Sequence, residues 1–408
     1  MTKTCVGVLL AVASLGCSSD SPPGASVAKD VTFLDSPLAQ IQNVSLIRAG
    51  DSFTLAGYEN GQVRWGRLSL DGVLTQETSF LLTQPLLGPF FAATKRTNPG
   101  DQLAAIVVTD SATIPGGYDL SAIVQTLGDS TAAAPVVLDT LPVGTDLSTV
   151  QIAAGAATSG NVGFVAWGIR VRGISPNYLL LPADAVTTAT PSKMFPDPDP
   201  ANVPAWDCLQ TTNGRTGLGF SVITPNQYLP QNSDFQGYEV DESGGAAAMT
   251  YQLTVAVANC RIVGSPTPEG NFFMAFQSTT AIDFATYYPP RDPTQDGTVT
   301  TYDPVLPAAN FGDPLSIPRP AWVNSAGGDV VIGLSRTAGP EVVRFTYNAV
   351  PHGATLPLRS EKGQTGPVAA WVGPSAVYVT YADQAKGSGS TPSVKRYFMR
   401  IESPAPLP

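Results

Sequence analysis

The chain has 408 residues, of which 43% are hydrophobic and only 13% are charged. Its 39 glycines and 37 prolines are too many for a helical bundle or a coiled coil, and its apolar content is too high for a disordered chain. A formal net charge of −10 argues against nucleic acid as a partner, and a single histidine excludes a multi-histidine zinc site.

The first residues predict an export signal. Residues 1–16 contain a largely apolar run, Val6–Leu15, which is shorter than the ~20 residues that a membrane-spanning helix needs. The run leads through Ser-Leu-Gly to Cys17, an ending that resembles the lipobox of bacterial lipoproteins. The resemblance implies that Cys17 is lipidated and becomes the first residue of the mature protein. An ordinary signal peptide, cleaved nearby with Cys17 as a bystander, is the alternative.

A polar tether follows the signal. Residues 17–29 are rich in serine and proline, and we expect them to connect the lipid to a single domain at 30–408. No later stretch approaches the ~20 apolar residues of a transmembrane helix, so the lipid is the predicted membrane attachment. These features predict an exported protein that is anchored to the bacterial envelope, with the outer membrane as the expected location.

The rest of the chain repeats one pattern. A short apolar segment leads through a glycine-containing turn to a strongly apolar strand, and an alternating strand follows. The pattern occurs at intervals of roughly fifty residues. The seven turns contain Gly50, Gly100, Gly160, Gly214, Gly270, Gly328 and Gly373. The apolar second strands are expected at Phe53–Gly57, Leu103–Val108, Gly163–Ile169, Gly217–Val222, Asn271–Phe276, Asp329–Leu334 and Ala376–Tyr381.

Further strands are expected to complete each unit. No segment shows a sustained apolar period of about 3.6 residues, so the predicted helix content is very low. The third strands are expected at Val63–Leu70, Tyr118–Thr126, Tyr178–Leu181, Gly237–Asp241, Ile282–Tyr287, Val342–Tyr347 and Val394–Ile401. Weaker fourth strands are expected at Thr78–Leu82, Pro135–Thr140, Ala247–Leu253 and Thr355–Leu358.

Seven units of antiparallel strands resemble a seven-bladed β-propeller, an all-β fold. The last unit ends at its third strand, near Ile401, whereas the strand-like segment Val31–Leu34 precedes the first unit. We therefore expect the N-terminal strand to complete the last blade and close the ring, because closure removes exposed sheet edges. Tandem β-sandwiches are the alternative, although sandwiches do not require a repeat near fifty residues.

The two cysteines of the body, Cys208 and Cys260, occupy matching first strands of consecutive units. Because disulfides persist in exported proteins, we predict that this pair forms a disulfide between neighbouring blades. Closing a loop of this size would stabilise the fold by about 4 kcal/mol in the chain-entropy model. Two buried free thiols are the alternative.

Motifs typical of catalysis or of metal binding are scarce. His352 is the only histidine and is interpreted as a surface-loop residue, since a Ser-His-Asp triad would depend on it alone. The acidic loops Asp197–Asp199 and Asp292–Asp296 have closely spaced carboxylates, which calcium prefers, but neither has the ligand order of an EF-hand. Both loops are interpreted as solvated turns, with calcium binding left open.

The densest acidic cluster lies on or just after a strand, and its members are Glu239, Asp241 and Glu242. It is interpreted as the solvent-facing edge of a blade, although glycoside hydrolysis also uses paired carboxylates. No phosphate-binding loop or dinucleotide fingerprint occurs, so no cofactor is predicted. The sequence assigns no catalytic, cofactor-binding or metal-binding residue.

Aromatic residues are expected to pack in the core or between blades rather than to form sugar platforms. Two long segments, Pro225–Phe235 and Tyr288–Asp313, are interpreted as exposed loops suited to recognition. The tryptophans are Trp65, Trp167, Trp206, Trp322 and Trp371.

Two functions are compatible with these observations. The favoured hypothesis is a monomeric envelope lipoprotein whose propeller is a non-catalytic binding or scaffold module for a protein or a glycan. The alternative is a glycan hydrolase or lyase that uses carboxylates on the central face of the propeller. The scarcity of histidine and of catalytic motifs favours the first, whereas the fold alone decides nothing.

Overall fold

The computed structural model shows antiparallel β-sheets with almost no helix. Two short 3-10 turns, η1 (Leu147–Thr149) and η2 (Pro200–Asn202), lie between strands. Among the described residues, no helix is long and apolar enough to cross a membrane. The structure describes residues 32–33, 38, 41, 44–49, 52–87, 91–96, 101–156, 162–181, 190–195, 199–213, 218–225, 233–240, 246–253, 262–266, 272–277, 281–288, 298–307, 321–322, 329–336, 339–346, 356–357, 369–372, 376–384 and 394–402.

The described strands form seven sheets of four strands each, and every strand pairs antiparallel with its neighbour. In the first three sheets the strands lie side by side in chain order. The first sheet contains β2 (Val44–Ala49), β3 (Ser52–Glu59), β4 (Gln62–Leu68) and β5 (Leu74–Leu81). The second contains β6 (Phe91–Arg96), β7 (Gln102–Asp110), β8 (Tyr118–Thr126) and β9 (Val136–Leu141). The third contains β10 (Val150–Ala156), β11 (Gly163–Ile169), β12 (Asn177–Leu181) and β13 (Ser192–Lys193).

The next three sheets repeat this order. The fourth contains β14 (Asp207–Asn213), β15 (Leu218–Pro225), β16 (Ser233–Val240) and β17 (Ala246–Leu253). The fifth contains β18 (Ile262–Pro266), β19 (Phe272–Gln277), β20 (Ala281–Tyr288) and β21 (Thr298–Pro307). The sixth contains β22 (Ala321–Trp322), β23 (Asp329–Arg336), β24 (Gly339–Thr346) and β25 (Leu356–Pro357).

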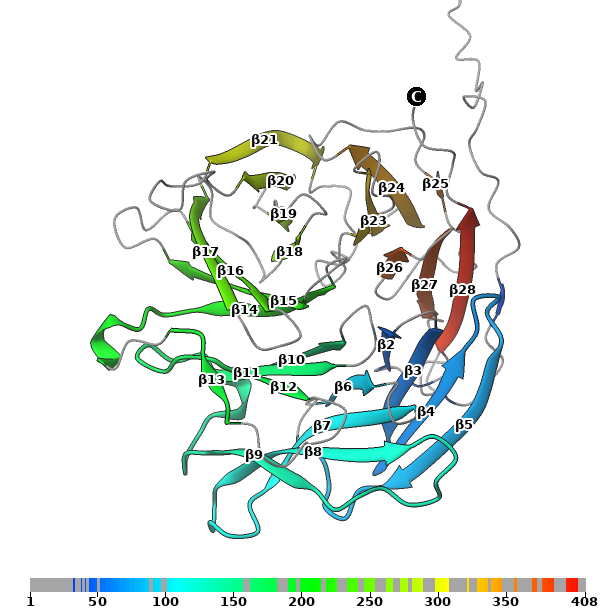
Figure 1. The fold of residues 1–408 in the computed structure, drawn as a ribbon, viewed down its shortest axis with the longest axis vertical. Helices are drawn as coiled ribbons and strands as arrows, with labels where there is room; N and C mark the ends of the chain where they lie inside the picture. Colours follow the sequence, from blue (N-terminus) through cyan, green and yellow to red (C-terminus); the bar gives the residue numbers. More distant parts are fainter. Residues whose placement is uncertain are drawn as a thin grey trace, which may run out of the picture.

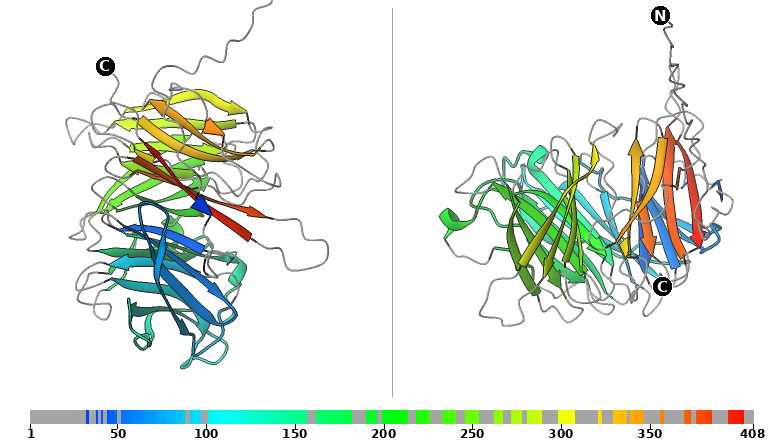
Figure 2. Two further views of the ribbon diagram at one scale, coloured as in Figure 1. Left: turned by 90° about the vertical axis from the view of Figure 1, so that its right-hand side faces the viewer. Right: turned by 90° about the horizontal axis from the view of Figure 1, so that it is seen from above.

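The seventh sheet joins the two ends of the chain. It contains β26 (Ala369–Val372), β27 (Ala376–Gln384) and β28 (Val394–Glu402), and its fourth strand is β1 (Thr32–Phe33). Figure 1 shows the sheets following one another around the molecule in chain order, with the seventh sheet beside the first. The views in Figure 2 show the same sheets from the side and from above.

In the second and third sheets, the second strand is buried on both of its faces. In β7, Leu103, Ala105 and Val107 pack against the first sheet, whereas Ala104 and Ile106 pack toward the third. A strand between two such layers has no solvent-facing side, which explains its continuous apolar sequence.

The same arrangement recurs at the neighbouring sheets. Trp167 of β11 packs toward the second sheet, and Phe164 of the same strand packs toward the fourth. Phe53 of the first sheet meets Phe398 of the seventh, with ring centroids 6.0 Å apart. The core is therefore a series of layers between sheets.

Buried tryptophans also form hydrogen bonds across the sheet junctions. Trp65 Nε1 of the first sheet donates to Gln125 Oε1 of the second over 2.6 Å. Trp167 Nε1 of the third donates to Asp139 Oδ2 of the second over 2.7 Å. Both tryptophans are buried, which confirms the prediction that they pack in the core or between sheets rather than form sugar platforms.

Most predicted strands are found, and one segment that was predicted to be a loop contains a strand. The strands predicted at 118–126 and 163–169 are β8 and β11 with the same bounds. The segment interpreted as a loop, Tyr288–Asp313, contains the ten-residue strand β21, so that prediction was wrong. Its run of threonine, tyrosine and valine favours a strand despite the proline and aspartate within it. The seven predicted turn glycines lie outside the described residues.

Candidate functional site

Connections from neighbouring sheets meet at one end of the molecule. Consecutive connections in an antiparallel sheet alternate between its two ends, so every second connection lies at this end. Val150 at the start of β10 pairs with Ile169 at the end of β11. Just beyond them, the Arg170 backbone N–H donates to the Thr149 carbonyl over 2.8 Å, which joins two connections. We name this surface the loop face, and it consists of residues 111–117, 142–149, 170–176 and 199–206.

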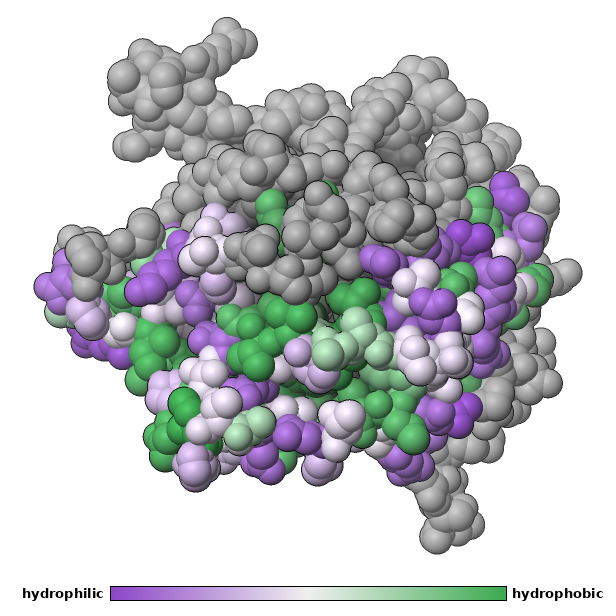
Figure 3. Space-filling model, turned by 60° about the horizontal axis from the view of Figure 1, so that its bottom comes forward, coloured by the Kyte–Doolittle hydropathy of each residue, from purple (hydrophilic) through white to green (hydrophobic). Residues whose placement is uncertain are grey.

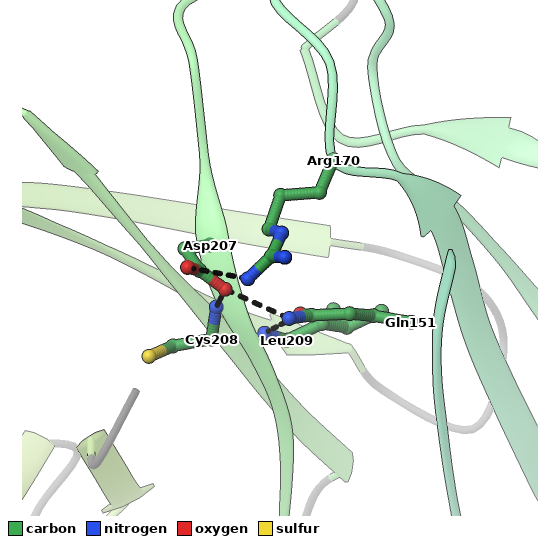
Figure 4. A network of polar contacts seen from close by, with 5 residues as sticks. All are labelled: Gln151, Arg170, Asp207, Cys208 and Leu209. Atoms are coloured by element: carbon green, nitrogen blue, oxygen red, sulfur yellow. Dashed lines mark hydrogen bonds and ion pairs between the residues drawn. The ribbon is translucent and has the colours of Figure 1, made fainter. Parts of the chain in front are cut away.

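A polar network joins the third and fourth sheets beside the loop face (Figure 4). Asp207, the first residue of β14, accepts at both carboxylate oxygens: Arg170 Nη1 lies 2.9 Å from Oδ2, and Gln151 Nε2 lies 2.7 Å from Oδ1. The backbone N–H of Cys208 also donates to Oδ1, over 2.7 Å. The Leu209 N–H donates to Gln151 Oε1 over 2.8 Å. Asp207 therefore acts as a connector between two sheets.

The network surrounds an irregular point of β14. The pairing register of β14 shifts between Asp207 and Gln210, and Cys208 has a φ of 60°. A left-handed backbone costs a non-glycine residue of order 1–3 kcal/mol, so it persists where neighbouring contacts hold it. The Cys208 side chain is buried. Its predicted partner, Cys260, lies outside the described residues, and the pairing stays a prediction.

Two further carboxylates beside the loop face also accept hydrogen bonds that fix the fold. Asp139 accepts from the indole of Trp167, as described above. Asp119 is buried and accepts from Thr140 Oγ1 over 3.0 Å and from the Ala112 N–H over 3.3 Å. Both acids are thus used to position strands and a connection.

Two exposed aspartates cap the 3-10 turns. Asp146 Oδ1 accepts from the Ser148 N–H over 2.9 Å at η1, and hydrogen bonds from the Ser148 backbone and side chain lower the pKa of this carboxyl. Asp199 Oδ1 accepts from the Ala201 N–H over 2.9 Å at η2. Asp199 belongs to the acidic loop considered for calcium, and its other acid, Asp197, lies outside the described residues.

Most of the remaining site residues considered from the sequence lie outside the residues that the structure describes. Glu239 lies on β16, opposite Gly219 and Ala247, and the acids predicted to lie close to it are outside the described residues. Among the residues that the structure describes, no group of three or more His, Cys, Asp or Glu side chains is placed to hold a metal ion. The residues outside the description are Cys17, Asp241, Glu242, Asp292–Asp296 and His352.

The sequence did not predict that Asp207 connects two sheets, although a role was predicted for each of its neighbours, Trp206 and Cys208. Trp206 is buried and donates through Nε1 to the Ile174 carbonyl over 2.8 Å, which confirms its predicted packing role. The sequence feature that accompanies this role is an aspartate at the start of the first strand of a unit. Its two partners lie in the preceding unit, and sequence spacing does not reveal such a contact.

Comparison with known proteins gives a likeness in fold. No protein-family model and no curated protein match the chain. The structure is similar to that of the polysaccharide lyase Uly1, with a TM-score of 0.55 and 9% identity over 93% of this chain and 99% of the lyase. It is also similar to a puromycin-hydrolyzing peptidase from Mycobacterium tuberculosis, with a TM-score of 0.51 and 12% identity over 91% of this chain. The match covers 54% of the peptidase, so the chain spans about half of its length.

Proposed function

We propose that the protein is a bacterial envelope lipoprotein, anchored through Cys17, whose body is a seven-bladed β-propeller. In this proposal β1 closes the ring, and the propeller is a non-catalytic binding or scaffold module for a protein or a glycan. The signal-like residues 1–16 and the tether at 17–29 support export and anchoring.

The packing of the second strands supports a propeller over tandem sandwiches. Each sheet of a sandwich buries one face against its partner, whereas β7 and β11 are buried on both faces. The pairing of Thr32 with Phe398, from opposite ends of the chain, supports closure. Both features are expected of sheets arranged as a ring.

The use of the acids supports a binding role over catalysis. A general acid or base must exchange its proton with a substrate, so it needs an oxygen within reach of that substrate. Asp119, Asp139 and Asp207 instead accept hydrogen bonds that fix strands and connections. This observation carries the proposal of a rigid, non-catalytic module.

Two measurements test the proposal. Cys17→Ala should move the protein from the membrane fraction to the soluble periplasmic fraction, because the lipid is the proposed anchor. Crosslinking of the anchored protein in intact cells, followed by pull-down under denaturing conditions, should recover a protein or glycan adduct. Continued sedimentation of the variant with membranes in high salt would contradict the anchor, and the absence of any adduct would contradict the binding role.

A glycan-cleaving enzyme is the second candidate function. The likeness to the polysaccharide lyase extends over almost the full length of both chains, and such folds also host enzymes. Incubation of the purified protein with a panel of acidic and neutral polysaccharides separates the candidates. New reducing ends or unsaturated sugars would favour the enzyme, and unchanged polymer length would favour the binding module.

We also propose that Cys208 forms a disulfide with Cys260. The buried position of Cys208 on β14, the first strand of its sheet, and the matching position of Cys260 in the sequence repeat support this pairing. Peptide mapping without reduction should recover one linked peptide pair. Two thiols that react with an alkylating reagent in the denatured but unreduced protein would contradict the disulfide.

A further inference from the structure

Exposed apolar side chains gather on the loop face. Seven large hydrophobic side chains among the described residues are exposed. Four of them lie on the loop face, and three are distributed over the first and second sheets. Figure 3, in which the lower part of Figure 1 comes forward, shows hydrophobic groups on the surface with hydrophilic ones between them. The four on the loop face are Ile114 (40% exposed), Val143 (65%), Val171 (44%) and Ile174 (38%).

Close turns hold these side chains in place. A Cβ atom at Gly116 would lie 3.8 Å from Cγ1 of Val143, so the connections that carry Ile114 and Val143 are in contact. The Ile174 N–H donates to the Val171 carbonyl over 3.2 Å, and the Ile174 carbonyl accepts from the buried Trp206. A surface that is already ordered loses little entropy on binding, so this arrangement favours recognition.

A positive charge lies within the apolar surface. Arg170 and Arg172 flank Val171, and Arg170 is held by Asp207. Arg172 is exposed, and its side chain makes no ion pair or hydrogen bond in the part of the chain that the structure describes. An exposed guanidinium beside aliphatic groups is complementary to a carboxylate that is itself flanked by apolar groups.

The chemistry of the loop face distinguishes between classes of partner. Its exposed apolar groups are branched aliphatic side chains, and the described tryptophans nearby, Trp167 and Trp206, are buried and offer no ring to stack on a sugar. Exposed acids, including Asp146 and Asp199, would repel an anionic lipid surface. An apolar centre with a polar rim that includes arginine is typical of protein interfaces.

We propose that the loop face binds a segment of a partner protein that presents apolar side chains beside a carboxylate. The carboxylate pairs with Arg172, and the apolar side chains cover Val143 and Val171. This inference rests on the proposed function as a binding module and names its partner class. A binding module that uses another surface would leave the proposed function intact and overturn this inference.

Photocrosslinking from single positions tests the proposal in intact cells. Benzoylphenylalanine is placed in the full-length, anchored protein at Val143 or Val171, and at Val73 or Val137 as controls with similar exposure elsewhere. We expect adducts from the two loop-face positions to the same protein segment, and none to it from the controls. Mass spectrometry of the adduct identifies the segment, which should contain aliphatic or aromatic residues next to aspartate or glutamate.

Charge exchange then separates a specific site from incidental contact. Arg172→Glu should lower the yield of the Val171 adduct about tenfold, and changing the carboxylate of the partner segment to arginine should restore it. Lys193→Glu, at an exposed position on β13 outside the loop face, is the control and should leave the yield unchanged. Equal melting temperatures of these variants show that the fold is kept.

Each other outcome overturns the inference. Adducts from the controls alone would place binding on another surface and leave the proposed function standing. Lipid, glycan or self-adducts from the loop face would assign the site to a membrane, a sugar or a second copy of this chain. Adducts that persist unchanged in Arg172→Glu, or no adduct from any position, would also overturn it.

Discussion

At the scale of single residues, the acids on and beside the loop face act as acceptors for neighbouring N–H groups. Asp207 joins two sheets, Asp139 accepts the indole N–H of Trp167, and Asp146 caps η1. Each contact fixes a strand or a turn whose backbone would otherwise be free to move. Substitution of these acids should therefore reduce stability. Because the acids are used to hold the fold, the exposed side chains between them are the groups available for recognition.

We predict that Asp207→Ala destabilises the fold by about 1–3 kcal/mol, because Gln151 and the Cys208 N–H lose their acceptor. Arg170→Met is the matched control, since it removes only the ion pair, whose side chains are each 38% exposed. Exposed ion pairs contribute up to about 1 kcal/mol, so the control should lose less. Urea unfolding measures both, and equal losses would show that the ion pair dominates the network.

We predict that Arg396→Met stabilises the protein by about 1–3 kcal/mol, because a buried guanidinium is costly when, as among the described residues, no carboxylate pairs with it. Arg396 of β28 is 6% exposed, its Nη2 donates to the Ile41 carbonyl over 3.3 Å, and its Nε is buried without an acceptor among the described residues. Arg400→Met, on the same strand, should change stability little, because the Arg400 side chain is 34% exposed and its Nη1 lies 3.9 Å from Asp71, although its Nε is also buried without an acceptor among the described residues. A lower midpoint in urea for Arg396→Met than for the wild type would contradict this account.

The same residue predicts a pH dependence. Burial lowers the pKa of Arg396 from its usual high value to about 10. Above pH 10 the folded protein binds fewer protons here than the unfolded chain, so the cost of burying this group decreases and stability increases as the pH rises further. The advantage of Arg396→Met should therefore shrink above pH 10. An advantage that stays constant between pH 9 and pH 11, in urea unfolding at each pH, would contradict the pKa shift.

At the scale of elements, the bounds of a strand could be predicted from the sequence where the strand itself has a clear apolar pattern. The strands β8 and β11 match their predicted bounds because apolar runs and flanking turns mark them. The two-residue strand β13 was missed because too few residues carry a pattern. β21 was missed because its proline and aspartate indicate a loop, whereas pairing with β20 holds it in the sheet.

The site was less predictable than the strands. The partners of Asp207 and of Trp167 lie in neighbouring sheets, and no local pattern records such contacts. The exposed Val143 and Val171 lie in connections where an apolar residue carries no periodic signal. Packing between sheets decides both kinds of feature, so they appear only when the sheets are placed side by side.

We predict that Gly168→Ala in β11 destabilises the fold by about 1–3 kcal/mol, because the new Cβ would lie 2.8 Å from Trp206 and 2.9 Å from the Pro176 backbone. Gly66→Ala in β4 is the control, since its Cβ would lie 3.1 Å from the side chain of Glu77, 3.2 Å from that of Leu74 and 3.3 Å from the Thr75 carbonyl oxygen, farther in each case than the two contacts at Gly168. The control should lose less than 1 kcal/mol, as roughly expected where a side chain can move away. Equal urea midpoints for the two variants would contradict the close approach at Gly168.

At the scale of the whole molecule, the last sheet depends on the first residues of the body. Thr32 and Phe33 pair with Phe398 and Tyr397, and Phe398 packs against Phe53 of the first sheet. The contact places β1 and β28 together although most of the chain lies between them. The residues just after the tether thus have a structural role in a sheet whose other strands lie at the far end of the sequence, a pairing that the strand-like segment Val31–Leu34 predicted.

We predict that a chain starting at Leu38 is less stable than a chain starting at Ala28 by about 1–3 kcal/mol, because removal of β1 leaves the backbone edge of β28 without its partner. Both chains keep Leu38 and Ile41, which pack in the core beside Phe398, so the comparison isolates the strand. Urea unfolding gives the difference, and hydrogen exchange should show faster exchange along β28 in the shorter chain. Equal midpoints and equal protection of β28 would mean that β1 does not stabilise the seventh sheet, and closure of the ring would then depend on side-chain packing alone.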